Sequence, residues 1–249
     1  MPNWRETAFG RGLMGAWALI TVPLTVIGIL LAVPVLGRPR AFFAVAPWFA
    51  RGFAWFCQAP FTFSGWDRVP EDIREGRQSV IFMSNHESQL DPPYLVAALP
   101  LPAVYIGKKE LKYVPFIGWA GWAAGVIFID RGDRERAIRS LHEAALEVRK
   151  GKNVVIFPEG TRTRTGELLP FKRGGLALAQ DAGVPIVPLA TVGGYGILAS
   201  GSMHIRPGRF TIVAGAPLYP ADFADRDALG AAVRQAIEAL VAEAKSLQA

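Results

Sequence analysis

The sequence SVIFMSNHESQLDPP, residues 79–93, passes from a mostly apolar run into a polar loop that contains a histidine and an aspartate. The run over 79–83 predicts a buried strand, because it is short, apolar and followed by polar residues. A short helix is predicted to follow, over Pro93 to Leu99. His86 therefore lies in the loop where a strand ends and a helix begins, which is where open α/β sheets build their sites.

His86 and Asp91 are the residues of this loop that suggest catalysis. A neutral imidazole can take a proton from a hydroxyl group, and a carboxylate on its other nitrogen fixes the tautomer and stabilises the imidazolium. Residues five apart on a regular helix differ by about 140°, so the two side chains can meet only across a turn. The alternative is structural: Asp91, which precedes Pro92, suits an N-cap whose carboxylate binds amides of the following helix.

The first quarter of the chain is apolar and aromatic. No charged residue occurs from Gly12 to Gly37, which is long enough to cross a hydrocarbon core of about 30 Å. Pro23 and Pro34 permit a kink or a break, so a spanning and a re-entrant helix both remain open. Residues 41–63 are rich in Phe and Trp, which suits the membrane interface. We expect residues 1–63 to form a pair of membrane-associated helices; a buried hairpin of a soluble protein is the alternative.

The overall composition narrows the class of protein. The 249 residues carry a formal net charge of +6 and a single cysteine, Cys57. One cysteine excludes an intramolecular disulfide and a cysteine-based metal site. The basic charge favours an anionic membrane surface, since the sequence has no nucleic-acid-binding motif. We therefore expect membrane lipids as partners, and neither a metal ion nor nucleic acid.

The rest of the chain alternates between predicted strands and helices, which is typical of an α/β fold. Residues 64–249 are thus expected to form one domain, a mixed sheet flanked by helices, after the membrane-engaging helical pair. A hairpin is expected where Pro207-Gly208 joins residues 203–206 to 209–214. The other predicted strands cover 61–66, 103–107, 125–130, 153–157 and 184–190, and the other predicted helices cover 133–150, 174–182 and 224–247.

Three further loops that follow predicted strands carry groups suited to an anionic ligand. Lys108, Arg131 and Arg162 each come just after a strand, so their cations can surround one phosphate group. Gly160 lets the backbone approach a ligand closely or take a positive φ. Glu159 is better placed to hold its loop, by accepting backbone hydrogen bonds, than to act as a second base.

Four blocks of sequence resemble, in order, those of the glycerolipid acyltransferases, specifically the lysophosphatidic acid acyltransferase family. Asn-His-x4-Asp at 85–91 resembles the first block and Gly-Val-Ile-Phe-Ile-Asp-Arg at 125–131 the second. Phe-Pro-Glu-Gly-Thr-Arg at 157–162 and Val-Pro-Ile-Val-Pro-Leu at 184–189 resemble the third and fourth. The resemblance covers roughly residues 61–218, and four ordered blocks are far more specific than one.

The resemblance implies acyl transfer without a covalent acyl-enzyme. His86 would deprotonate the hydroxyl of the acceptor, which then attacks the carbonyl of an acyl thioester, while Asp91 would hold and balance the imidazolium. Arg162 and Arg131 match family positions tied to the acceptor phosphate, and Lys108 is expected to join them.

The third block is expected to shape the acceptor site. Glu159 and Gly160 match it, and backbone amides near Gly160 are candidates for stabilising the oxyanion. One departure from the family is Glu87, where glutamine is common; we expect its carboxylate to point to solvent.

The expected function is transfer of a fatty acyl group to the sn-2 hydroxyl of 1-acylglycerol 3-phosphate, which gives phosphatidic acid. The donor substrate would be an acyl-coenzyme A or acyl carrier protein thioester, and no cofactor is expected. We expect the protein on the cytoplasmic face of the inner membrane. The alternatives are acylation of another lysolipid, such as a lyso-ornithine lipid, and a non-catalytic membrane protein that binds anionic lipid.

Overall fold

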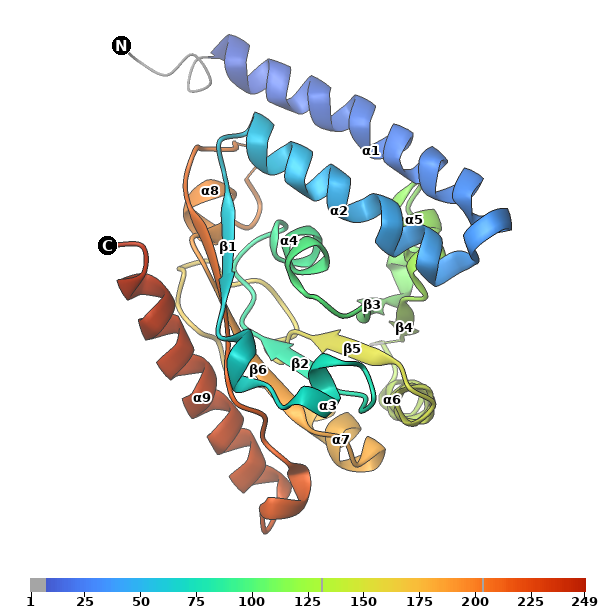
Figure 1. Ribbon diagram of the computed structural model, residues 1–249, viewed down its shortest axis with the longest axis vertical. Helices are drawn as coiled ribbons and strands as arrows, with labels where there is room; N and C mark the ends of the chain where they lie inside the picture. Colours follow the sequence, from blue (N-terminus) through green and yellow to red (C-terminus); the bar gives the residue numbers. More distant parts are fainter. Residues whose placement is uncertain (1–7, 131, 203) are drawn as a thin grey trace.

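The fold is built around a seven-stranded mixed sheet (Figure 1). The computed structural model describes residues 8–130, 132–202 and 204–249. The strand order is β1-β7-β6-β2-β5-β3-β4. The strands are β1 (Phe61–Ser64), β2 (Ile81–Ser84), β3 (Ala103–Lys108), β4 (Ile127–Ile129), β5 (Asn153–Ile156), β6 (Ile186–Val192) and β7 (Phe210–Ala214).

The direction of the strands determines where a site can form. Strands β6, β2, β5, β3 and β4 are parallel to one another, whereas β7 is antiparallel to β6 and β1 is parallel to β7. The carboxyl ends of β2 to β6 therefore lie at one edge of the sheet. The predicted mixed sheet is confirmed, and the loops that carry the candidate residues converge on this edge.

Helices cover both faces of the sheet. On β2, Phe82 packs in the same hydrophobic cluster as residues of α2 (Arg38–Phe56) and α4 (Asp91–Ala98). Its neighbours Ile81 and Met83 point to the opposite face, which is the period of two expected for a strand. There they pack with α6 (Arg134–Arg149), α7 (Arg173–Ala182) and α9 (Arg226–Ser246). Because both faces of β2 are buried, its sequence is almost uniformly apolar.

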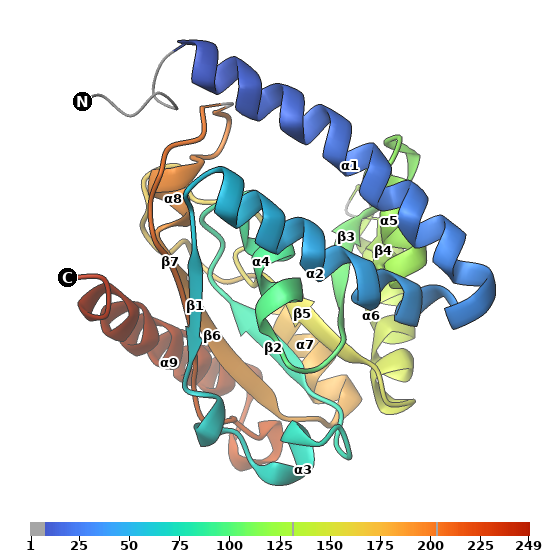
Figure 2. The ribbon, with the colours of Figure 1, turned by 45° about the horizontal axis from the view of Figure 1, so that its top comes forward.

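The N-terminal helical pair forms an outer layer. Helix α1 (Ala8–Leu36) lies along α2, which separates it from the sheet (Figures 1 and 2). Val26 and Ile29 of α1 are buried, and Trp17 stacks on Phe49 and Phe56 of α2. The predicted pair of helices is therefore present, with Leu19–Leu36 long and apolar enough to cross a membrane at a mean hydropathy of 2.6.

The predicted hairpin over 203–214 is wrong. Residues 204–209 form no strand, and Met203 lies outside the described residues. The amides of this segment bond elsewhere: that of Arg206 donates to the Ile197 carbonyl at 2.8 Å and that of Gly208 to the Gln58 carbonyl at 3.0 Å. Only β7 remains as a strand, and it pairs with β6 and β1 instead of with a hairpin partner.

Several short helices were not predicted from the sequence. The most substantial is α5, which lacks the polar face that marks an amphipathic helix. The unpredicted helices are η2 (Trp66–Arg68), α3 (Glu71–Arg74), η3 (Lys109–Tyr113), α5 (Ile117–Ala124), α8 (Gly194–Ile197) and η4 (Pro220–Asp222).

Candidate active site

The loop after β2 is fixed to the neighbouring strand before it reaches His86. The Asn85 side chain accepts a hydrogen bond from the amide of Thr191 on β6 and donates one to the Thr191 carbonyl, both at 2.7 Å. Asn85 is buried, so this pair of bonds replaces the water that its amide would otherwise need. The position at which the loop leaves the sheet is thereby set.

His86 and Asp91 are in direct contact. Nδ1 of His86 lies 2.6 Å from Oδ2 of Asp91. The same oxygen accepts the amides of Glu87 at 2.8 Å and Ser88 at 2.9 Å, so the intervening segment is a turn closed on the carboxylate. The predicted meeting across a turn is confirmed. The N-cap alternative is wrong, because Asp91 is the first residue of α4 and its carboxylate binds amides of the preceding loop.

The environment of the pair gives each nitrogen of His86 a distinct role. Asp91 is fully buried; burial raises the pKa of its carboxyl, and the hydrogen bond from His86 opposes that shift. With Nδ1 held by the carboxylate, Nε2 is the ring nitrogen left to accept a proton. The His86 side chain is 15% exposed, so a substrate can reach it from one side.

Two aromatic rings orient the imidazole. Phe157, just after β5, stacks on His86 with ring centres 3.9 Å apart and planes 13° apart. Tyr105 of β3 stacks behind Phe157 at 6.2 Å, and its hydroxyl donates to the Pro92 carbonyl at 2.8 Å. Neither ring was predicted from the sequence to lie at the site. The available signal was an aromatic residue just after β5, at Phe157, and another within β3, the strand that pairs with β5, at Tyr105.

Glu159 joins the loop after β5 to the loop after β2, which carries His86 and is here called the catalytic loop for its proposed role. Its Oε1 accepts the amide of His86 at 2.7 Å, and its Oε2 accepts the amide of Leu169 at 2.8 Å. Burial raises the pKa of Glu159, and these two amides oppose the shift. The amide of Thr163 in turn donates to the His86 carbonyl at 2.9 Å. The prediction that Glu159 accepts backbone hydrogen bonds is confirmed.

Gly160 is favoured by its backbone conformation, a positive φ that L side chains rarely adopt. Its φ is +69°, and a Cβ there would lie 2.9 to 3.0 Å from the side chain of Lys172. Its amide already donates to the Phe157 carbonyl at 2.9 Å. The amide of Gly160 itself is therefore engaged and is a poor candidate for an oxyanion donor. Lys172 is a cation near the site that sequence analysis did not include.

The Arg162 guanidinium is suited to bind an anion. Its Nη1 atom is buried, and within the described parts of the chain it has no hydrogen-bond partner. A buried guanidinium nitrogen without an acceptor is costly, so a ligand oxygen would satisfy it. Arg162 immediately precedes Thr163, whose amide is bonded to His86, so the cation belongs to the same group of loops.

Lys108 and Arg131, the other two cations predicted to bind a phosphate, give less evidence of an anion site than Arg162. Lys108 is exposed at the carboxyl end of β3, at the correct edge of the sheet. The next residue, Lys109, forms an ion pair with Asp130 at 3.2 Å. Arg131 lies outside the described residues.

Glu87 does not point to solvent, contrary to expectation. The residue is 6% exposed, and its Oε2 accepts the amide of Tyr195 at 3.3 Å. Burial raises the pKa of Glu87 to about 7. The amide comes from α8, a turn that packs against the catalytic loop at Gly194: a Cβ there would lie 2.9 Å from Cβ of Ser88 and 3.0 Å from Oδ1 of Asp91.

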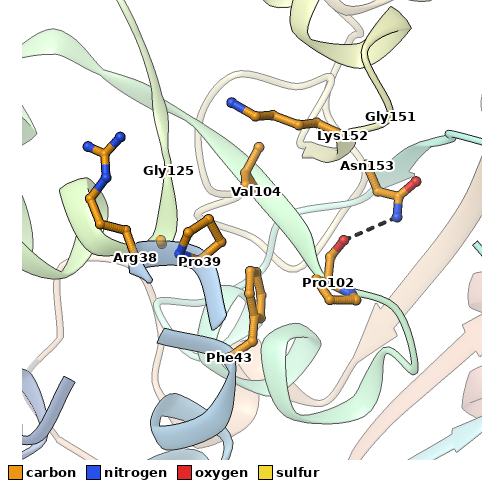
Figure 3. A pocket seen from close by; sticks show the side chains of 10 residues that line it. Arg38, Pro39, Phe43, Pro102, Val104, Gly125, Gly151, Lys152 and Asn153 are labelled. Atoms are coloured by element: carbon orange, nitrogen blue, oxygen red, sulfur yellow. Dashed lines mark hydrogen bonds between the residues drawn. The ribbon is translucent and has the colours of Figure 1, made fainter. Parts of the chain in front are cut away.

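A separate cavity of about 190 Å³ lies between the start of α2 and the loops that precede β3, β4 and β5 (Figure 3). Arg38, Phe43 and Asn153 are among the residues that line it. These loops lead into the strands, so the cavity is at the amino edge of the sheet, opposite His86. It contains none of the predicted site residues.

A histidine whose inner nitrogen is held by a buried carboxylate is typical of enzymes that activate a hydroxyl or a water molecule. The family model described as Acyltransferase matches residues 61–192, which include this pair and the loops around it. The chain belongs to that acyltransferase family.

Relatives with curated names share one description. The chain is 39% identical over 140 residues to 1-acyl-sn-glycerol-3-phosphate acyltransferase of Saccharomyces cerevisiae, covering 52% of this chain and 46% of the relative. It is 33% identical over 229 residues to such a protein of Chlamydomonas reinhardtii, covering 89% and 66%. The human beta form is 38% identical over 154 residues, covering 61% and 54%. The chain thus spans about half to two thirds of these relatives' lengths.

A solved structure shares the fold. The 1-acyl-sn-glycerophosphate (LPA) acyltransferase PlsC from Thermotoga maritima superposes with a TM-score of 0.72. The match covers 91% of this chain and 97% of that one at 24% identity, so it establishes the architecture and no more.

Proposed function

We propose that this protein transfers a fatty acyl group from an acyl thioester to the sn-2 hydroxyl of 1-acylglycerol 3-phosphate, producing phosphatidic acid. The observation that carries the proposal is the 2.6 Å contact between Nδ1 of His86 and the buried carboxylate of Asp91. The names of its relatives point to the same acceptor.

The proposed reaction proceeds in one displacement at the thioester. Nε2 of His86 takes the proton of the sn-2 hydroxyl as the oxygen attacks the thioester carbonyl. The tetrahedral intermediate collapses, the carbon–sulfur bond breaks, and the imidazolium returns the proton to the departing thiolate. Asp91 stabilises the imidazolium throughout and keeps Nε2 directed at the acceptor. No acyl-enzyme forms, and no cofactor is required beyond the donor, acyl-coenzyme A or an acyl carrier protein thioester.

Cations near His86 would hold the acceptor phosphate. The buried Nη1 of Arg162 supports this assignment, since a phosphate oxygen would supply its partner. Lys172 lies beside the same loop, and Lys108 and Arg131 follow neighbouring strands. Glu159 would keep this loop in register with His86 through its two backbone bonds.

The N-terminal helices would place the reaction at a membrane. The acyl chains of the acceptor and of the product are bilayer components, and α1 presents Leu24, Leu31 and Val35 at 60%, 73% and 85% exposure. Such exposure of large apolar side chains is typical of a lipid-facing surface. We further propose that the protein lies on the cytoplasmic face of the inner membrane.

Acyl transfer to a panel of lysolipids tests the proposal. Membranes carrying the wild-type protein are supplied with a radiolabelled acyl thioester and lysophosphatidic acid, lyso-ornithine lipid or other lysolipids. The proposal predicts labelled phosphatidic acid as the main product. His86→Ala should lose roughly 10²-fold or more of the rate, while His142→Ala, an exposed histidine on α6, should not. Equal labelling by the His86→Ala variant would favour the non-catalytic lipid-binding alternative.

A further inference from the structure

A second apolar surface lies outside the N-terminal helical pair, on η3 and α5. Tyr113 is 73% exposed, Ile117 and Trp119 are each 51% exposed, and Trp122 is 47% exposed. Trp119 and Trp122 are three residues apart and therefore share a face of α5. We call Tyr113, Trp119 and Trp122 the α5 patch, and leave out Ile117 because residues two apart on a helix do not share a face. Large exposed apolar side chains gathered in this way indicate an interaction site.

The α5 patch is part of a rigid unit. A Cβ at Gly118 would lie 2.1 Å from the carbonyl oxygen of Lys112, so η3 and α5 pack with their backbones in contact. A Cβ at Gly121 would lie 3.0 Å from the ring of Phe128 on β4. The side chains of the patch are therefore exposed on a fixed backbone, because η3 packs against α5 and α5 packs against β4.

The patch is continuous with the N-terminal helical pair. Ala123 of α5 packs in one buried cluster with Ile29 of α1 and Ala41 of α2. The guanidinium of Arg38, in the first turn of α2, lies 4.8 Å from the ring centre of Trp122. Both views show α5 beside the end of the helical pair at which α1 turns into α2 (Figures 1 and 2).

The chemistry of the neighbouring surface indicates a lipid bilayer as the occupant. On α1, the exposed residues Leu24, Ile27, Leu31 and Val35 recur every three or four positions, forming one apolar face. On α2, Trp48 and Trp55 are 74% and 79% exposed on either side of Arg51. Exposed tryptophans beside arginine are typical of the headgroup region, where an indole is half in hydrocarbon and a guanidinium reaches water.

We propose that η3 and α5 form a third membrane-contacting element, with the α5 patch seated in the same leaflet as the apolar face of α1. The helix η3 begins directly after Lys108, at the carboxyl edge of the sheet where His86 lies. Contact through η3 and α5 brings this edge to the bilayer surface, so a lipid acceptor can reach the site without leaving the membrane. The inference concerns the docking surface and does not depend on the catalytic chemistry.

Depth-dependent quenching of a fluorescent label tests the inference. In a Cys57→Ala background, a single cysteine is introduced by Trp119→Cys, Leu31→Cys or Ile138→Cys and carries an environment-sensitive fluorophore. The full chain is reconstituted in phosphatidylcholine and phosphatidylglycerol vesicles that contain nitroxide-labelled lipid. Position 31 is the reference for the apolar face of α1. Position 138, 58% exposed on α6 across the sheet, is the matched control.

The inference predicts that the label at 119 shows a blue shift and a loss of intensity comparable with those at 31. Tyr113→Cys, at the most exposed position of the patch, should behave in the same way and keeps the test decisive if the Trp119 variant misfolds. Quenching at 119 and 113 as weak as at 138 would overturn the inference. A label at 119 that is shifted equally in detergent and in vesicles, without quenching by lipid, would mean that protein covers the patch, and would overturn it as well.

Discussion

Asp91 and Glu87 are neighbouring buried carboxylates with different hydrogen-bond partners. One oxygen of Asp91 has three hydrogen-bonding contacts, with Nδ1 of His86 and with two amides. Glu87 accepts hydrogen bonds from the backbone of Tyr195, at 3.3 Å, and of Gly193, and burial raises its pKa to about 7. Burial raises the pKa of both carboxyls, but it is Asp91 whose carboxylate contacts the imidazole of His86. Asp91 is therefore the carboxylate suited to stabilise an imidazolium, and Glu87 is a cost to stability when it is ionised.

The Glu87→Gln variant is expected to gain stability relative to wild type as the pH rises. A carboxyl with a folded pKa near 7 and an ordinary value of 4.5 binds more protons in the folded state between these pH values, so wild-type stability falls across that window. Glutamine carries no charge and avoids this loss. The advantage of the variant in urea unfolding in micelles should grow by about 2 to 3 kcal/mol from pH 5 to pH 8. An advantage that is constant with pH would contradict the burial of an ionisable Glu87.

The Arg162→Gln variant is expected to bind the acceptor more weakly. A hydrogen bond to a charged group contributes about 1.5 to 3 kcal/mol, so the KM for lysophosphatidic acid should rise roughly 10- to 100-fold. The rate at saturation should fall less, because the phosphate is remote from the bond that forms. Steady-state kinetics with Arg164→Gln, an exposed arginine two residues away, provide the control. An unchanged KM in the Arg162 variant would place the phosphate elsewhere.

At the scale of elements, α8 supports the catalytic loop through glycine. Gly194 lies so close to Ser88 and Asp91 that a methyl group would displace the turn that holds His86. Gly196, in the same short helix, has open space at the corresponding position. The two glycines thus offer a matched pair of substitutions within one element.

Gly194→Ala should destabilise the protein by about 1 to 3 kcal/mol, the usual cost of overpacking, and should also reduce activity. Gly196→Ala should leave both nearly unchanged. Thermal unfolding and initial rates of acyl transfer, measured on both variants in the same detergent, check the expectation. Equal effects of the two substitutions would show that the contact at Gly194 does not control the catalytic loop.

An element was predictable from the sequence when the contacts that stabilise it leave a local pattern, and it was not when its contacts are with residues far along the chain. Strands β2 and β5 were predictable, because burial on both faces leaves a short apolar run in the sequence. The hairpin prediction failed because the amides of 206 and 208 bond to residues 197 and 58. Glu87 was placed wrongly for a similar reason: its partner Tyr195 is far along the chain. The contact of His86 with Asp91 was predictable because both residues lie in one turn.

At the scale of the whole molecule, the sheet and the helical layer act together. The parallel strands bring the loops after β2, β5 and β6 to one edge of the sheet. There the loop after β5 is bonded to the loop after β2, because Glu159 accepts the amide of His86 and the amide of Thr163 donates to the His86 carbonyl. The apolar surfaces of α1, α2 and α5 lie on the side of the sheet that also carries α4. In the proposed reaction, the acyl donor and the lipid acceptor would meet at this edge of the sheet.

The central claim is that His86 and Asp91 act as one catalytic unit, and a double-mutant comparison tests it most directly. The initial rate of phosphatidic acid formation is measured for wild type, His86→Ala, Asp91→Asn and the double variant, in the same membranes at equal protein levels. Residues that act as a unit are strongly non-additive, so the double variant should be about as slow as His86→Ala alone. Losses that multiply, or a His86→Ala variant as fast as wild type, would contradict the claim.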